Sequence, residues 1–284
     1  MSAFVTRFAP SPTGYLHRGH AYSALTAFEA AKRTGGDFLL RIEDIDATRC
    51  RPDFERAIFD DLHWLGLCWP EPVLKQSEQL PDYEAALESL RECGLVYRCF
   101  KTRRELAEEA QRAPHGPTMA HTGAALPSSE EVSLLDRDKP FAWRLSLAAA
   151  SRHLGGFDDL TFVEKGAGPA GEAGLIRADP AVAGDIVLAR KDVGVAYHLA
   201  VVVDDARQGV TDVVRGNDLF AACHSQRLLQ ALLNLPTPTY HHHPLLVGPD
   251  GKRYAKRDRA QSLREIRQSG VTASDLRREL GFSG

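Results

Sequence analysis

Residues 7–20 have the sequence RFAPSPTGYLHRGH, and this stretch decides how the fold begins. Residues 3–8, which lead into it, have the β-branched and aromatic content of a short strand, and the segment PSPTG must then form a loop. Residues 17–32 are rich in Ala and Leu and end near two glycines at 35–36, as expected for a helix with a glycine stop. The order strand, tight loop, helix is typical of an α/β unit.

The rest of the chain continues this alternation. The predicted strands are residues 37–42, 185–189, 196–203 and 210–214, and the predicted helices are residues 53–65, 83–93, 218–233, 261–268 and 273–280. Strands that alternate with helices indicate a parallel sheet and an α/β fold class. Residues 101–140 depart from the pattern, with a charged helix followed by Pro, His, Gly and Ser, and are interpreted as a peripheral insertion.

The first predicted helix begins in the manner of a phosphate-binding site. Backbone amides and the helix dipole at its N-terminus favour an anion. His17 and His20 lie three residues apart, hence on one helical face, and Gly19 leaves room for a flat ring beside the backbone. Two imidazoles there can donate hydrogen bonds to phosphate oxygens, although an isolated pair of this kind more often caps or decorates an ordinary helix.

Charged side chains follow three predicted strands. Arg7, Glu43 and Arg215 each stand at a strand end, and ligands of open α/β sheets bind outside the carboxyl ends of the strands. Tyr197 adds a hydroxyl from another predicted strand. Simpler interpretations stay open. Arg7 could pair with Glu43 across neighbouring strands, Arg215 could form an ion pair with Asp204 or Asp205, and Tyr197 could belong to the hydrophobic core.

A basic run follows a glycine-rich turn in GPDGKRYAKRDRA, residues 248–260. We expect a cationic loop that can close over ATP phosphates and stabilise the charge on departing pyrophosphate. The alternative is a solvated face or a general RNA contact.

Composition limits the partners. Lys and Arg (35) nearly balance Asp and Glu (38), and the net charge of −3 gives no overall basic surface, so any contact with RNA must be local. The five cysteines form an odd, scattered set, which favours free thiols in a reducing compartment. No signal peptide or membrane span is evident. We expect a cytoplasmic monomer.

Two motifs resemble those of one family. The RFAPSPTG string with its HRGH sequence resembles the first signature of glutamyl-tRNA synthetases of class I, and RYAKR resembles their second, KMSKS-type signature. Arg18 replaces an aliphatic residue of the first signature, while Arg253, Tyr254 and Ala255 depart from the second. These changes are expected to affect loop packing and rate, while both imidazoles and the ammonium of Lys256 remain.

The resemblance implies a Rossmann-like class I catalytic core with an inserted smaller subdomain and a short helical C-terminal extension. It also implies roles for particular residues. The catalytic residues would be His17, His20 and Lys256, and these together with Gly19 would bind ATP. In the amino-acid site Arg7, Ala9 and Ser11 would line the pocket, Glu43 and Tyr197 would serve the ammonium end, and Arg215 would hold the side-chain carboxylate of glutamate.

Two patterns resemble metal sites, but neither is expected to bind a metal. The segment VYRCFKTRREL resembles one in which many relatives begin a zinc site with Cys-x-Cys. Here Cys99 is present, but Lys101 stands where the second thiolate would be. His115 and His121 do not repair this, since a lysine at a ligand position repels zinc, and no structural zinc is expected. The run His241-His242-His243 lies in a strand, so its side chains point to alternating faces and cannot meet one ion.

The expected organisation is a first half of the core at 1–100, the insertion at 101–140, a second half with acceptor-end elements at 141–247, and the basic loop with a helical tail at 248–284. Reading an anticodon requires an additional domain that contacts bases far from the active site. Only a short helical tail follows the basic loop, so no anticodon-binding domain is expected. Truncated relatives of this kind resemble the glutamyl-queuosine tRNA(Asp) synthetases. That resemblance implies activation of glutamate by ATP with Mg²⁺, without tRNA, and transfer to the queuosine base of tRNA(Asp).

Two alternatives stay open: a short glutamyl-tRNA synthetase that charges the tRNA terminus, and a catalytically retired paralogue that binds or regulates. No candidate general base for the transfer step stands out in the sequence.

Overall fold

The computed structural model describes residues 3–102, 104–106, 121–190, 194–246 and 261–283. The strands are β1 (Val5–Phe8), β2 (Asp37–Ile42), β3 (Leu74–Lys75), β4 (Val96–Cys99), β5 (Ala142–Leu145), β6 (Thr161–Glu164), β7 (Gly174–Arg177), β8 (Val187–Arg190), β9 (Gly194–Val195), β10 (Asp212–Gly216) and β11 (Thr239–His243). The helices are α1 (Arg18–Thr34), α2 (Pro52–Trp64), α3 (Leu80–Glu92), α5 (Ser128–Asp136), α6 (Leu147–Leu154), α7 (Tyr197–Arg207), α8 (Ala222–Leu232), α9 (Leu263–Gln268) and α10 (Ala273–Glu279).

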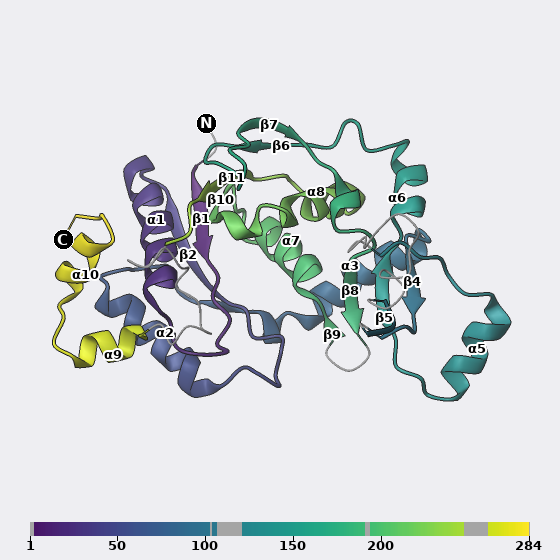
Figure 1. Ribbon diagram of the computed structural model, residues 1–284, viewed down its shortest axis with the longest axis horizontal. Coiled ribbons are helices and arrows are strands. Elements are labelled where there is room, and N and C mark those ends of the chain that lie inside the picture. Colours follow the sequence, from purple (N-terminus) through teal and green to yellow (C-terminus); the bar gives the residue numbers. More distant parts are fainter. Residues whose placement is uncertain (1–2, 103, 107–120, 191–193, 247–260, 284) are drawn as a thin grey trace.

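Parallel strands form the layer that carries the candidate site. β1 pairs with β2 and β2 with β3, and a second group has the order β10, β11, β6, β7, of which β7 alone is antiparallel to its neighbour. β1 and β10 lie side by side, because Thr211 N donates to Val5 O at 3.0 Å and Val5 N donates to Thr211 Oγ1 at 2.9 Å. The carboxyl ends of β1, β2 and β10 therefore meet at one edge (Figure 1).

The first strand, helix and strand follow the predicted order for identifiable reasons. Gly35 ends α1 in the left-handed conformation, with φ 64°. At Gly36 a Cβ would lie 2.1 Å from Phe4 O, so the return of the chain into β2 requires glycine. Asp37 N then donates to Phe4 O at 2.8 Å, which starts the pairing of β1 with β2.

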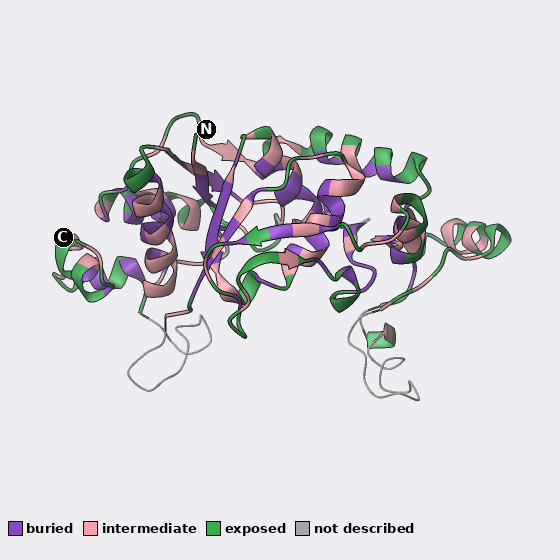
Figure 2. Cartoon of the chain, turned by 90° about the horizontal axis from the view of Figure 1, so that it is seen from above, coloured by how far each residue is buried: buried purple, intermediate pink, exposed green. Residues whose placement is uncertain are grey.

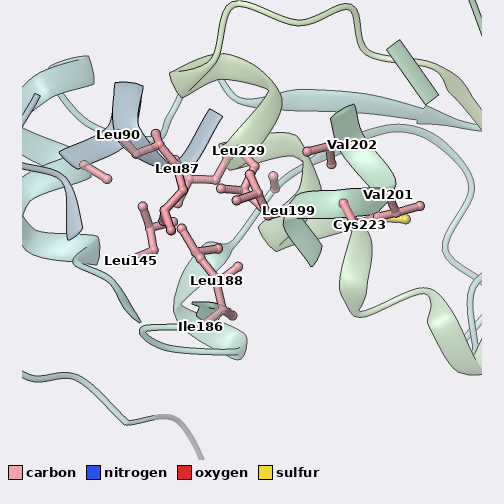
Figure 3. Close-up of a cluster of buried hydrophobic side chains, with 14 of the residues drawn as sticks. Leu87, Leu90, Leu145, Ile186, Leu188, Leu199, Val201, Val202, Cys223 and Leu229 are labelled. Atoms are coloured by element: carbon pink, nitrogen blue, oxygen red, sulfur yellow. The ribbon is translucent and has the colours of Figure 1, made fainter. Parts of the chain in front are cut away.

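A separate, antiparallel sheet has the order β4, β5, β8, β9 and lies at the other end of the molecule, with α5 beyond it (Figure 1). Between the two ends, Leu199 of α7, Leu229 of α8 and Leu87 of α3 meet Leu145 and Leu188 of the small sheet (Figure 3). Buried residues concentrate along the central strands and α7, whereas α5 is exposed or half-buried (Figure 2). The core therefore links the parallel layer to the small sheet.

The prediction of a strand at residues 196–203 is wrong. The segment forms the first part of α7, whose Leu199, Val201 and Val202 are buried together with Asp204 and Asp205. A helix buried on most of its surface has no polar stripe, and its run of valines is indistinguishable by periodicity from a buried strand. Tyr197 accordingly projects from the first turn of a helix.

The predicted C-terminal helices are confirmed as α9 and α10, which pack beside α1 and α2 (Figure 1). Arg18 Nε donates to Glu279 Oε1 at 2.7 Å, so the residue that departs from the first signature ties α1 to α10. The five cysteines are free thiols. Among the described helices none is long and apolar enough to cross a membrane. The cytoplasmic location, the monomeric state and the division at residues 100, 140 and 247 stay predictions.

The burial of Asp61, at the contact between α2 and α9, leads us to expect that the stability of the protein depends on pH. The side chain is fully buried, neither oxygen has a hydrogen-bond partner within the described chain, and Arg267 Nη2 of α9 lies 3.8 Å away. Burial raises the pKa of Asp61 from 3.8 to about 6, with Arg267 acting in the opposite direction. The folded state thus holds this proton more tightly than the unfolded chain, and its stability falls as pH rises from about 4 to about 6.

We therefore expect Asp61→Asn to raise the free energy of unfolding at pH 7 by about 1–2 kcal/mol, allowing for screening, with no gain below pH 4. Urea denaturation at both pH values measures this. An equal difference between variant and wild type at pH 4 and pH 7 would contradict it.

Candidate active site

A cavity of about 580 Å³ opens where β1, β2 and β10 end and α1 begins. All the sequence-predicted site residues within the described chain line it: Arg7, Ala9, Ser11, His17, Gly19, His20, Glu43, Tyr197 and Arg215. Lys256 lies outside the described residues. The strand ends thus bring together side chains that are more than 200 positions apart in the sequence.

His17 and His20 each accept a hydrogen bond from the backbone at the start of α1. His17 is the N-cap of α1: its Nδ1 accepts from Gly19 N at 3.1 Å, and His20 Nδ1 accepts from His17 N at 3.2 Å. The ring centroids are 3.9 Å apart. In the neutral imidazole the proton must then reside on Nε2, the nitrogen that the helix backbone does not use. Helix capping and phosphate contact are therefore compatible in the same side chains.

A buried network of charges supports one wall. Asp205 Oδ1 accepts from Arg7 Nε at 3.0 Å and from Arg41 Nη1 at 2.7 Å, and Asp205 Oδ2 accepts from Arg7 Nη2 at 3.3 Å. Asp204 accepts from Tyr83 Oη at 2.8 Å and from Gln76 Nε2 at 2.7 Å. Arg7 therefore pairs with Asp205 of α7, which was not foreseen, and its charge is compensated before any ligand binds.

Glu43 pairs with Arg41, whose Nη2 lies 3.4 Å from Glu43 Oε1. The partner of Glu43 is therefore Arg41, and not Arg7 as the sequence had left open. Burial raises the pKa of Glu43, with Arg41 and Arg7 acting in the opposite direction, whereas the pKa of Asp205 is lowered because both arginines outweigh its burial. Glu43 lines the cavity and is thus an acidic group to which an ammonium can bind.

Asp205→Asn tests the network. The amide leaves two buried guanidinium groups without their shared anion, and we expect a loss of about 3–5 kcal/mol in the free energy of unfolding. Urea denaturation measures the loss. The matched control is Asp158→Asn, which breaks an exposed pair of 3.0 Å with Arg177 and should cost less than about 1 kcal/mol. Equal midpoints for the two variants would contradict the expectation.

Arg215 differs from Arg7 in having no anionic partner among the described residues. Only 4% of the residue is exposed, and its donors reach uncharged acceptors: His242 Nε2 at 3.0 Å, Leu219 O at 3.1 Å, Cys223 Sγ at 2.9 Å and Gln226 Oε1 at 3.0 Å. Within the described residues no carboxylate lies within ion-pair distance, and Nη1 has no hydrogen-bond partner. A buried cation of this kind is costly unless an anion joins it.

Tyr197 stands next to Arg215 on the cavity wall. Burial raises the pKa of Tyr197, and Arg215 only partly offsets this, so the phenol stays protonated at neutral pH and its oxygen can accept a hydrogen bond from an ammonium.

Some of the cavity lining was only partly predicted from the sequence. These further lining residues are Tyr22, Ser23, His243, Leu245 and Leu246. His243 Nε2 lies 3.1 Å from Ser23 Oγ, and its ring meets Tyr22 edge-on at 5.1 Å. The run His241-His242-His243 was the sequence signal that could have identified His243 as a lining residue. Its three side chains have different surroundings in the structure, as the alternation of a strand predicts.

Residues on either side of the basic run lie at the site. Leu246, which precedes residues 247–260, lines the cavity. Ser262, which follows them, forms a β-bridge with His17, and Leu263 N donates to Leu16 O at 2.8 Å. The basic loop itself, with Lys252, Arg253, Tyr254, Ala255, Lys256, Arg257 and Arg259, lies outside the described residues.

The zinc-like pattern falls on β4 and the segment after it. Cys99 is buried in β4, His121 pairs with Gly184 through a β-bridge, and His115 lies outside the described chain. In the part that the structure describes, no three Asp, Glu, His or Cys side chains group as a metal site.

A parallel α/β layer, a helix that begins with two histidines, and a charged cavity at the strand ends are the features expected of a class I synthetase core. Comparison with known proteins agrees. The profile of the class I tRNA synthetases (E and Q), catalytic domain, matches residues 3–284.

Individual relatives extend this. A "Glutamyl-Q tRNA(Asp) synthetase" of Rhodobacter capsulatus is 44% identical, with 98% of this chain and 100% of that protein covered. A protein of the same name from Nocardia farcinica is 41% identical over 95% of this chain and 81% of its own length. The crystal structure of glutamate-tRNA synthetase from Elizabethkingia anophelis superposes with a TM-score of 0.75 at 28% identity, and the match spans 90% of this chain but about half (53%) of that one.

The chain therefore belongs to the class I tRNA synthetases of the glutamate and glutamine (E and Q) type. The expected fold class and the resemblance drawn from the motifs are confirmed.

Proposed function

We propose that the protein activates glutamate with ATP, without tRNA, and transfers it to the queuosine base of tRNA(Asp). The proposal has two parts, the choice of amino acid and the choice of acceptor. The cavity supports the first part, and the relatives support the second.

Arg215 is the observation that carries the choice of glutamate. Its buried guanidinium lacks an anion within the described chain and keeps Nη1 without an acceptor. The side-chain carboxylate of glutamate supplies both the charge and the acceptor, whereas the amide of glutamine brings no charge and can turn its own donors toward Nη1. Glu43 and Tyr197 then take the ammonium end, and Arg7, Ala9 and Ser11 line the remaining wall.

In the first step, an α-carboxylate oxygen of glutamate bonds to the α-phosphorus of ATP, the bond to the β-phosphate bridge breaks, and pyrophosphate leaves. Charge shifts onto the phosphate oxygens as this happens. His17 and His20 donate from Nε2 to those oxygens, and donors fixed in advance are most effective at developing charge. Gly19 leaves the base and ribose room beside α1. Lys256, which lies outside the described residues, is the predicted cation for the leaving group.

Magnesium is proposed only as the companion of ATP. The described residues build no three-ligand metal site, and Mg²⁺ at nucleotide sites is held largely by phosphate oxygens and water. When bound, it neutralises phosphate charge.

In the second step, a hydroxyl of the modified base attacks the acyl carbon of glutamyl-adenylate and AMP leaves. The choice of acceptor rests on the relatives named glutamyl-Q tRNA(Asp) synthetase, which are 41–44% identical to this chain over nearly its whole length.

The test uses labelled glutamate and ATP with three acceptors: tRNA(Asp) containing queuosine, tRNA(Asp) without it, and unmodified tRNA(Glu). We expect label only on the first, in an anticodon-loop fragment after nuclease digestion. Label on the terminal ribose of tRNA(Glu) would instead identify a short glutamyl-tRNA synthetase. A failure of glutamate to promote exchange of pyrophosphate into ATP would favour a retired paralogue.

A further inference from the structure

A row of buried polar side chains continues from Arg215 away from the cavity. Arg215 Nε donates to His242 Nε2 at 3.0 Å, and His242 Nδ1 lies 2.5 Å from Glu164 Oε2. Arg215 lines the cavity, but His242 of β11 and Glu164 of β6 do not, and these two are 2% and 1% exposed. They form a chain of contacts from the interior of the sheet to the proposed ligand-binding arginine.

The proton positions along this row follow from the chemistry of its members. A guanidinium has only donors, so His242 Nε2 must be unprotonated to accept from Arg215. The proton of a neutral imidazole then resides on Nδ1 and is donated to Glu164. The carboxylate also accepts from the backbone N–H of His242 at 2.9 Å and of Gly166 at 2.7 Å, so three donors point at it.

The electrostatics favour the same arrangement. Burial lowers the pKa of His242, and Arg215 lowers it further, although Glu164 acts in the opposite direction, so the imidazole is neutral at pH 7. Burial acts to raise the pKa of Glu164, but the hydrogen bonds from His242 and Gly166 outweigh it. An ionised Glu164 therefore holds a neutral His242 in one tautomer.

The arrangement orients Arg215 without neutralising it. Nε is fixed by His242, and Nη2 is fixed by Leu219 O, Cys223 Sγ and Gln226 Oε1, so the plane of the guanidinium is set. The negative charge of Glu164 stays one imidazole away. Within the described residues Nη1 has no hydrogen-bond partner, and Arg215 lines the cavity, so Nη1 is the donor that we assign to a ligand.

We propose that Glu164 and His242 are positioning residues for amino-acid selectivity, which fix the guanidinium of Arg215 so that its free edge accepts a carboxylate and rejects an amide. The proposal rests on the proposed activation of glutamate. A donor held rigidly against an amide NH₂ leaves both unpaired, whereas a donor that can turn away discriminates much less.

His242→Gln and Glu164→Gln test the proposal by glutamate-dependent pyrophosphate exchange in the full chain. We expect the KM for glutamate to rise by about 10- to 100-fold, the preference for glutamate over glutamine to fall by a similar factor, and the KM for ATP and kcat to change less than about threefold. A general loss of structure would lower kcat and shift both KM values together.

His241→Gln is the matched control. This neighbouring residue also pairs with a carboxylate, since its Nε2 lies 2.8 Å from Asp212 Oδ1, but it points to the other face of β11 and does not contact Arg215. We expect its KM for glutamate to stay at the wild-type value.

A second readout needs neither activity nor a variant that folds. The ¹⁵N chemical shifts of the His242 ring in the ligand-free wild type should show the neutral Nδ1–H tautomer at pH 7. An Nε2–H tautomer, or unchanged KM for glutamate and unchanged discrimination in folded His242→Gln and Glu164→Gln, would overturn the proposal. If wild type shows no exchange while the Nδ1–H tautomer is present, the proposed function fails and the positioning contact itself stands.

Discussion

Replacing Arg215 by glutamine is expected to lower kcat/KM for glutamate in pyrophosphate exchange by about 10²- to 10³-fold. Removing one partner of a buried charge pair costs about 3–5 kcal/mol, and each 1.4 kcal/mol corresponds to a factor of ten. The loss should fall on glutamate and not on ATP, because Arg215 lies at the end of β10, whereas the histidines proposed to contact ATP lie at the start of α1. Selectivity for glutamate over glutamine should largely disappear.

Arg215→Lys separates charge from geometry. Lysine keeps the positive charge but lacks the planar fork that meets a carboxylate and reaches four fixed acceptors at once. We expect an intermediate loss with partial selectivity. A ligand-binding readout accompanies the kinetics: glutamate should raise the melting temperature of wild type and fail to do so for Arg215→Gln. Wild-type KM for glutamate in a folded Arg215→Gln protein would contradict this role.

The second large effect is expected for His17→Asn. Asparagine is a good N-cap, so its side-chain oxygen can still accept from Gly19 N, while the Nε2–H donor toward phosphate is lost. Removing one donor that stabilises developing charge typically costs about 10²- to 10³-fold in rate, and kcat for exchange should fall by that factor. The stabilisation of the protein by glutamate should be unchanged.

His17→Ala is the companion variant. It loses the donor and the cap together, so its exchange rate should match that of His17→Asn while its free energy of unfolding falls by about a further 1 kcal/mol. An exchange rate of His17→Asn within a few-fold of wild type would remove His17 from the proposed chemistry.

The convergence of the site was predictable because it follows from topology. Arg7, Glu43 and Arg215 each stand at the end of a predicted strand, and parallel strands present their carboxyl ends at one edge. The helix start was predictable as well, since His17, Gly19 and His20 occupy fixed positions along it. In both cases the sequence pattern and the backbone geometry impose the same result.

The choice of partners was not predictable. The sequence allowed Arg7 with Glu43 and Arg215 with Asp204 or Asp205, but in the structure Asp205 takes Arg7 and Arg41 instead. That choice depends on how α7 packs against β2, and α7 itself was mistaken for a strand because its apolar run lacks periodicity. Which carboxylate meets which guanidinium is decided by tertiary packing.

The positioning pair was hidden for a different reason. Glu164 lies on β6, a strand of four residues that the sequence did not predict, and it approaches His242 across 78 positions. Strands this short carry too few residues for a clear alternation.

The role of Arg215 in binding the side chain of glutamate can be observed in a crystal structure with a non-hydrolysable glutamyl-adenylate analogue. We expect the side-chain carboxylate to accept a hydrogen bond from Arg215 Nη1, with the ammonium toward Glu43 and the phosphate beside His17 and His20. A carboxylate bound elsewhere, more than about 4 Å from every nitrogen of Arg215, would contradict it.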